Sequence, residues 1–346
     1  MKLKRRIKLA LAKQFLGYCS HLSFALSIRS NKMIEPCACM STNVKSELLP
    51  FEKNSFITVL NAPLYKNSRN FINGRNHNEP VFSICKSCRL KEHTRYPFIT
   101  LKSFTVALSG ISFSGKLKKI KNLIQILFEA FMKKEAITAA PIYANIDPVN
   151  ACNLECPFCV VGAGDDIFEK ELLKIEDFKE IMQEIGPYLF HLSLYRYGEP
   201  FLHPKIFEMI AEAKKYGIYV HISTNLLLLD EIKIKKLVEA KPDQIIACAD
   251  GVNQETYQKY RRKGDYALFI KNLTLLSQEI NKQRANIELK WQFLVFGYNE
   301  HQIKEAEEIA TKIGAAFSAE AAYINGDDEE YKEFIPSKKA YTLNDE

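Results

Sequence analysis

The chain has 346 residues, 47% of them hydrophobic, and a formal net charge of +7. This size allows more than one domain, and no uncharged apolar run of about 18 residues predicts a membrane-spanning helix. Residues 1–34 hold eight Lys or Arg and no acidic residue, so the remainder sums to −1 (7 − 8). Because the basic charge belongs to the N-terminus, we expect no nucleic-acid-binding groove.

Residues 1–35 are interpreted as a basic N-terminal segment. Residues 1–8 could begin a signal peptide, but Lys13 interrupts the apolar stretch and no small-residue cleavage site follows. A partly ordered terminus is preferred over a segment that rests on an anionic membrane or a partner. The chain also has nine cysteines, an odd number, which favours reduced thiols and a cytoplasmic location over a secreted disulfide framework.

Residues 36–98 predict a small irregular module with one short helix near residues 63–71. Cysteines stand toward both ends, as Cys37 and Cys39 and then Cys85 and Cys88. Four thiolates can close a metal site, which leaves zinc and an iron–sulfur cluster as alternatives. Because the module shows little apolar periodicity, we expect a metal to hold it together.

Residues 99–140 predict a linker with an amphipathic helix. Apolar residues recur there at helical spacing, with lysines between them: Leu117, Ile120, Ile124, Leu127 and Phe131. A helix packed against the neighbouring domain is the preferred interpretation, because such stripes usually face a core. A helix lying on a membrane surface is the alternative.

Residues 141–325 alternate between strand and helix patterns, followed by a tail at 326–346. The predicted strands are 142–147, 190–195, 218–223, 244–249, 288–296 and 315–319, with helices such as 206–216 and 232–240 between them. Repeated βαβ units imply an α/β fold with a parallel sheet. Six strands are too few for a closed barrel of eight, so we expect a (βα)6 partial TIM-like barrel with its chemistry at the carboxyl ends of the strands.

Three cysteines lie close together after the first of these strands, in the pattern C-x3-C-x2-C. They are Cys152, Cys156 and Cys159. Thiolate is the ligand that iron–sulfur clusters require, and three such ligands leave one iron of a cubane open. A structural zinc site needs four ligands, and the next histidine is distant, at His191. Three cysteines on one loop are also hard to explain as packing, so a [4Fe–4S] cluster is favoured. The remaining two, Cys19 and Cys248, are interpreted as buried small apolar residues without partners.

With Phe158 before its last cysteine, this loop resembles the hallmark of the radical S-adenosylmethionine (SAM) superfamily, and the resemblance covers roughly residues 141–325. Residues 197–200, Tyr-Gly-Glu-Pro, resemble the family's GGE motif, with Tyr197 in place of its first glycine. The resemblance implies that Gly198 and Glu199 bind the methionine amino group of SAM. A carboxylate can accept hydrogen bonds from an ammonium group, although a solvated loop carboxylate is the default alternative.

Two further segments are similar to SAM-binding parts of that family. Ser223, Thr224 and Asn225 match a segment that contacts the ribose and carboxylate, with helix capping as the alternative. Asp250 matches an Asp-Gly turn, and Arg261 the arginine that follows it. The arginine could clamp the SAM carboxylate, with an exposed charged run at residues 261–263 as an equal alternative.

The resemblance implies a radical SAM enzyme that reductively cleaves SAM to a 5′-deoxyadenosyl radical, which abstracts hydrogen from a substrate. A reductant such as flavodoxin or ferredoxin is then needed. Residues 36–98 resemble part of a SPASM domain, which implies an auxiliary [4Fe–4S] cluster on Cys37, Cys39, Cys85 and Cys88. The same resemblance favours a peptide or protein as the substrate and leaves small molecules as an alternative. The alternative function is a non-catalytic iron–sulfur or zinc scaffold. No residue is assigned a catalytic role beyond these cofactor contacts.

Overall fold

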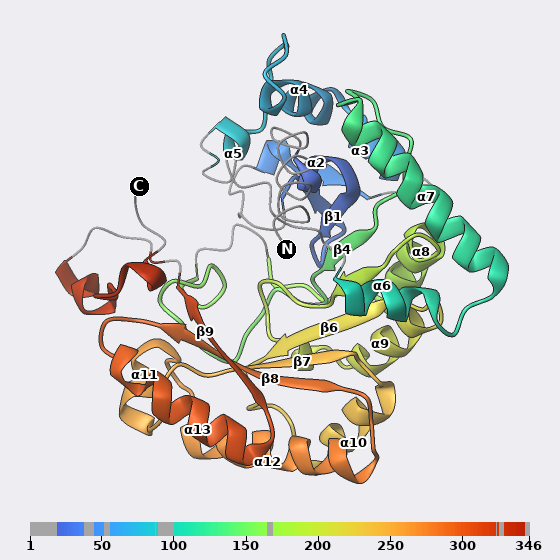
Figure 1. The fold of residues 1–346 in the computed structure, drawn as a ribbon. Helices are drawn as coiled ribbons and strands as arrows, with labels where there is room; N and C mark the ends of the chain where they lie inside the picture. Colours follow the sequence, from blue (N-terminus) through green and yellow to red (C-terminus); the bar gives the residue numbers. More distant parts are fainter. Residues whose placement is uncertain are drawn as a thin grey trace, which may run out of the picture. The chain divides into compact units, whose positions relative to one another are not determined.

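The computed structural model describes residues 19–37, 45–51, 56–86, 88, 100–164, 169–322, 324 and 329–342. Its contacts divide the chain into two compact units. The first comprises Met1–Asp147, Leu173–Ser193 and Glu212–Tyr219, and the second comprises Pro148–Leu172, Leu194–Ala211 and Val220–Glu346. Each unit is described by itself, and Figure 1 gives the labels of the elements.

The first unit contains five strands in the order β3-β2-β1-β4-β5. Their bounds are β1 Ala25–Ile28, β2 Met33–Glu35, β3 Leu49–Pro50, β4 Tyr143–Ile146 and β5 His191–Ser193. β1 is fully buried and pairs in parallel with β4, whereas β2 and β3 are antiparallel additions. Part of the basic N-terminal segment is therefore paired with the first strand of the predicted α/β region, which the sequence analysis did not foresee.

Helices make up most of the remainder of the first unit. They are α2 Ser20–Phe24, α3 Phe56–Leu60, α4 Pro63–Ile72, α5 Ser83–Lys86, α6 Leu101–Leu108, α7 Phe113–Phe131 and α8 Ile175–Ile185. The short helix predicted near residues 63–71 is confirmed as α4, which begins with a proline at its first turn, where a missing N–H costs nothing. Two shorter helices, α3 and α5, join it in the segment predicted to be irregular.

Helix α7 confirms the helix predicted within residues 99–140, but its apolar side faces away from the protein rather than toward it. Each of the five residues of the predicted apolar stripe is at least 37% exposed. The buried residues of the helix are instead mostly polar: Lys119, Asn122, Ile126, Glu129 and Ala130. The preferred interpretation, in which the stripe packs against the protein, is therefore wrong. The side of α7 that meets the unit carries these polar residues together with Ile126, which joins a buried apolar cluster with Ile142 and Phe190.

The second unit is built on four parallel strands in the order β6-β7-β8-β9. These are β6 Tyr219–Thr224, β7 Gln244–Cys248, β8 Glu288–Val295 and β9 Ala316–Ala321. The connecting helices are α10 Glu231–Ala240, α11 Gln254–Tyr260, α12 Tyr266–Lys282 and α13 Ile303–Ile313, and α9 Ile206–Lys214 precedes β6. Burial alternates along β8, as expected for a strand with one face in a core.

The predicted α/β fold with its six strands is confirmed. β4 to β9 lie within about two residues of the predicted ranges, and helices separate them along the chain as βαβ units require. Gly217 and Gly314, which follow α9 and α13, adopt left-handed backbone angles of φ +67° and +87°. In the second unit, the carboxyl ends of β6 and β7 lead directly into Asn225 and Asp250, where the candidate site lies.

Candidate active site

The cysteine loop belongs to the second unit and packs beneath an aromatic cluster. Cys156 is buried and Cys152 and Cys159 are half-buried, and none of the three forms a disulfide. The Phe158 ring lies 4.9 Å from that of Tyr331 and 5.1 Å from that of Phe334, measured between centroids. These rings shield one side of the loop from water, which suits a site whose chemistry must exclude solvent.

The three thiols have the donor chemistry that a [4Fe–4S] cluster needs. Burial raises the pKa of Cys152 to about 11 and that of Cys156 to about 12, with neighbouring thiols adding to the rise, so a bound cation must displace their protons. Three thiolates on one loop are the donor set that binds three irons of a cubane, whereas a structural zinc site requires four ligands. The donor chemistry of these residues therefore fits a cluster.

Gly198 lies against the backbone of the cysteine loop. A Cβ at this position would lie 2.0 Å from the carbonyl oxygen of Val149 and 2.6 Å from that of Ala151, both closer than atoms can approach. The next backbone N–H, that of Glu199, donates a hydrogen bond of 2.8 Å to the same Ala151 oxygen. The Tyr-Gly-Glu-Pro segment is thus fixed to the cysteine loop, and this contact requires a glycine at position 198.

Glu199 joins that segment to the loop that follows β6. Its side chain is buried, and its carboxylate accepts hydrogen bonds from the Thr224 hydroxyl at 2.7 Å, the Asn225 N–H at 2.8 Å and the Phe201 N–H at 3.2 Å. Burial raises its pKa to about 6 despite these donors. A carboxylate offers about four acceptor positions, so this one has capacity for one further donor. The alternative of a solvated loop carboxylate is wrong.

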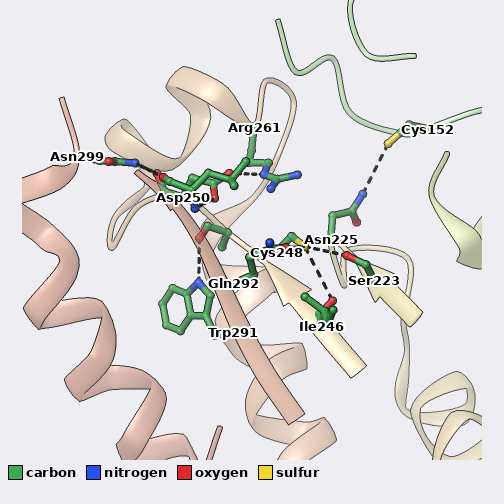
Figure 2. A network of polar contacts seen from close by, with 12 residues as sticks. Cys152, Ser223, Asn225, Ile246, Cys248, Asp250, Arg261, Trp291, Gln292 and Asn299 are labelled. Atoms are coloured by element: carbon green, nitrogen blue, oxygen red, sulfur yellow. Dashed lines mark hydrogen bonds and ion pairs between the residues drawn. The ribbon is translucent and has the colours of Figure 1, made fainter. Parts of the chain in front are cut away.

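The Ser223–Asn225 segment points its side chains toward the cysteine loop and β7. The Asn225 amide donates to Oδ1 of Asn153 at 2.9 Å and lies 3.9 Å from Sγ of Cys152, while the Ser223 hydroxyl lies 3.0 Å from Sγ of Cys248 (Figure 2). These side chains cap no helix. The N-cap of α10 is Asp230, five residues further on, so the capping interpretation is wrong.

Asp250 and Arg261 form a buried ion pair beside these loops. Nε of Arg261 donates to Oδ2 of Asp250 at 2.6 Å, and the two side chains are 14% and 0% exposed (Figure 2). Burial raises the pKa of Asp250, and Arg261 opposes the rise. Its positive charge also lowers the pKa of Cys152, Cys156 and Glu199. Arg261 therefore does not belong to an exposed charged run, and only its neighbours Arg262 and Lys263 are exposed.

Asn299 supports this ion pair and received no role in the sequence analysis. Its side-chain amide donates to the carbonyl oxygens of Asp250 and Leu294, both at 3.0 Å, and its Oδ1 accepts from the Phe296 N–H. The Leu294 N–H in turn donates to Oδ1 of Asp250 at 2.7 Å (Figure 2). Its partners are backbone carbonyl oxygens, so its residue type and its place in the sequence do not reveal this role.

The N-terminal cysteines belong to the first unit. Cys39 lies outside the described residues. Burial raises the pKa of Cys85, and the thiols of Cys19, Cys37 and Cys88 raise it further. Burial likewise raises the pKa of Cys19 to about 12, with smaller contributions from Cys37 and Cys88. The burial of Cys19 agrees with its interpretation as a buried small residue, and its thiol lies within electrostatic range of Cys37 and Cys88.

The second unit thus brings three reduced thiols and several buried polar side chains together near the carboxyl ends of its parallel strands. The model of the radical SAM superfamily matches residues 146–313, which include the cysteine loop, Glu199, Asn225, Asp250 and Arg261. This match confirms the resemblance to the superfamily that the cysteine loop predicted. Among the residues that the structure describes, no helix is long and apolar enough to cross a membrane.

Several curated relatives match part of the chain. A Fe-coproporphyrin III synthase of Methanosarcina barkeri is 32% identical over 144 residues, which are 39% of this chain and 36% of that protein. A PqqA peptide cyclase of Granulibacter bethesdensis is 31% identical over 113 residues, 31% of this chain and 29% of that protein. The chain thus spans about a third of the length of these relatives. The crystal structure of Streptococcus suis SuiB bound to S-adenosylmethionine is 17% identical, with a TM-score of 0.48 over 69% of this chain and 60% of that one.

Proposed function

We propose that the chain is a radical SAM enzyme that holds a [4Fe–4S] cluster on Cys152, Cys156 and Cys159 and cleaves SAM reductively. One observation carries the proposal: the loops that follow several strands are tied together at Cys152. Glu199 bonds to the backbone beside Cys152 and holds Asn225, whose amide approaches the Cys152 thiol. A purely structural loop gives no reason for so many buried polar groups to converge on three reduced thiols.

The polar residues around the cysteine loop have complementary charges for SAM. Glu199 supplies a buried carboxylate toward an ammonium group, with Gly198 keeping the loop close enough. Arg261 supplies a guanidinium toward the SAM carboxylate, and Asp250 fixes its orientation through Nε. Ser223, Thr224 and Asn225 offer hydroxyl and amide groups suited to a ribose. When bound, SAM and the cluster supply a 5′-deoxyadenosyl radical that abstracts hydrogen from a substrate.

The wider assignment is also a proposal. A peptide or protein is the preferred substrate, because one curated relative is named for a peptide, while another is named for a porphyrin product and keeps small molecules open. A flavodoxin or ferredoxin would supply the electron, and a cytoplasmic location suits reduced thiols. The proposed domains are a basic segment (1–35), a module with an auxiliary cluster (36–98), a linker (99–140), the radical SAM core (141–325) and a tail (326–346).

The test is formation of 5′-deoxyadenosine by the full chain. The protein is purified without oxygen, reconstituted with iron and sulfide, reduced with dithionite and mixed with SAM. We expect the product from the wild-type chain and none from a variant with Cys152→Ala, Cys156→Ala and Cys159→Ala. The matched control is Cys248→Ala, which removes a buried thiol outside the proposed ligand set and should retain the iron bound at the loop.

Two results would contradict the proposal. The first is equal iron content in the wild type and the triple variant, which would mean that the loop binds no iron. This result would favour the non-catalytic scaffold. Equal product from the triple variant would show that another site cleaves SAM. A chain that holds the cluster and binds SAM but yields product only when candidate peptides are added would support the proposal and identify a substrate-gated enzyme.

A further inference from the structure

Helix α7 exposes a continuous apolar surface. The α7 stripe consists of Phe113, Leu117, Ile120, Ile124, Leu127, Phe128 and Phe131. The exposed fractions reach 81% at Phe113, 61% at Ile124 and 55% at Phe131. Spacings of three and four residues place these side chains on one side of the helix. Single exposed apolar residues are ordinary on protein surfaces, but a contiguous stripe along a 19-residue helix indicates an interaction surface.

The opposite side of α7 is held to the first unit by polar groups. Lys119 donates from Nζ to the Leu189 carbonyl, and the Asn122 side chain exchanges two hydrogen bonds with the Ala140 backbone, at 2.8 and 2.9 Å. Glu129 accepts from both the N–H and the hydroxyl of Thr138, at 2.8 and 2.7 Å. Because buried polar groups need these partners, turning the helix to bury its apolar side would leave them unsatisfied. The outward direction of the stripe is therefore built into the packing.

The borders of the stripe are basic. At about 100° per residue, Lys116 falls on one border and Lys121 on the other. Lys134 follows the helix and lies 5.0 Å from the ring centroid of Phe128. The helix has a single acidic residue, Glu129, and it is only 1% exposed. Lysines beside an apolar face can extend their ammonium groups to an anionic layer while their stems cover apolar surface.

We propose that α7 lies on the surface of a membrane that contains anionic lipids, with the stripe in the boundary between headgroups and acyl chains. Charge favours this lipid surface over two other occupants, a second copy of the chain and residues 1–18. A second copy seated on the stripe would add its own lysines at the borders, with no exposed acid on either helix to pair with them. Residues 1–18 carry six Lys or Arg and no acid, so their composition offers these lysines no opposite charge either. An anionic lipid surface supplies that charge.

The geometry fits a helix that lies flat rather than one that spans. α7 has lysines within its length and a hydrogen-bonded polar side, and among the described residues no helix meets the requirements for a membrane span. An amphipathic helix binds with an affinity that grows with its buried apolar area and with its attraction to anionic lipids. Binding is therefore expected to need both the stripe and the lysines, and to weaken as salt rises.

The experiment measures binding of the full chain to vesicles by flotation. Wild-type protein should bind vesicles of phosphatidylcholine with 30% phosphatidylglycerol and should bind pure phosphatidylcholine about tenfold more weakly. The double variant Ile124→Glu, Leu127→Glu should lose at least about tenfold in affinity for the anionic vesicles. Both positions are exposed, so its circular dichroism and melting temperature should match the wild type. The matched control is Ile232→Glu on α10, where the original side chain is 67% exposed, and it should bind as wild type does.

Three outcomes would overturn the proposal. The first is a wild-type chain that does not float with anionic vesicles. The second is a double variant that binds as tightly as the wild type, which would assign binding to another segment such as residues 1–18. The third is a wild-type dimer in analytical ultracentrifugation that the double variant converts to a monomer without any vesicle binding, which would assign the stripe to a second copy. None of these results depends on cleavage of SAM.

Discussion

Arg261 is joined to Asp250 by a 2.6 Å hydrogen bond from Nε to Oδ2, in a position where neither side chain is more than 14% exposed. We expect Asp250→Asn to destabilise the second unit by about 3–5 kcal/mol, because it leaves the guanidinium buried without its counter-charge. The measurement is urea denaturation of the anaerobic protein. Lys263→Gln breaks an ion pair with Glu155 in which both partners are more than half exposed, and it should cost less than about 1 kcal/mol. Equal losses would contradict this assignment of the pair.

Gly198 offers a steric prediction. In Gly198→Ala the new Cβ would overlap the Val149 and Ala151 carbonyl oxygens, so either the cysteine loop or the Tyr-Gly-Glu-Pro segment must move. We expect a cost of about 1–3 kcal/mol and a reduced iron content after reconstitution. Gly115→Ala is the control, because a Cβ there meets its nearest neighbours at 3.4 Å, an ordinary contact distance. Full iron content in Gly198→Ala would mean that the loop tolerates the shift.

Strands β4 to β9 could be predicted from the sequence because most of them are short apolar or alternating segments next to a glycine or proline. The orientation of α7 could not. Periodicity tells which residues share a side of a helix, but it does not tell which side meets the protein. That choice depends on the Leu189 and Ala140 carbonyls, which lie outside α7 and accept hydrogen bonds from its polar side.

The candidate site divides in the same way. The cysteine loop, Glu199 and Arg261 stand in recognisable motifs, so the sequence identified them. The role of Asn299 could not be identified in this way, because it depends on the backbone carbonyl oxygens of Asp250 and Leu294. Strand β1 was missed because four apolar or small residues next to a basic one give too short a signal. The basic neighbour, Arg29, is accommodated in the fold by an ion pair with Glu35 at 2.5 Å, which the sequence alone does not show.

The N-terminal cysteines should be dispensable for cleavage of SAM. In the double variant Cys85→Ala, Cys88→Ala, we expect the metal bound to the first unit to be lost. Formation of 5′-deoxyadenosine should stay within about twofold of wild type, because an auxiliary site supplies no ligand to the SAM-binding iron. Metal per chain is measured by mass spectrometry alongside the product assay. Loss of product with the cysteine-loop iron retained would contradict this separation of the two sites.

His191 should make the protein sensitive to acid. It lies between the rings of Tyr143 and Tyr219, with centroids 5.2 and 5.0 Å away, and burial lowers its pKa to about 4. A histidine with a lowered folded-state pKa contributes stability above its unfolded value of about 6.5, and this stability is lost as the pH falls toward 4. The shift corresponds to about 3 kcal/mol. His191→Phe keeps a ring in place and should reduce the loss of stability between pH 6.5 and 4. The measurement is urea denaturation at each pH. The control, His301→Asn at an exposed position, should lose as much stability over this range as the wild type. An unchanged decline in His191→Phe would assign the acid sensitivity to other groups.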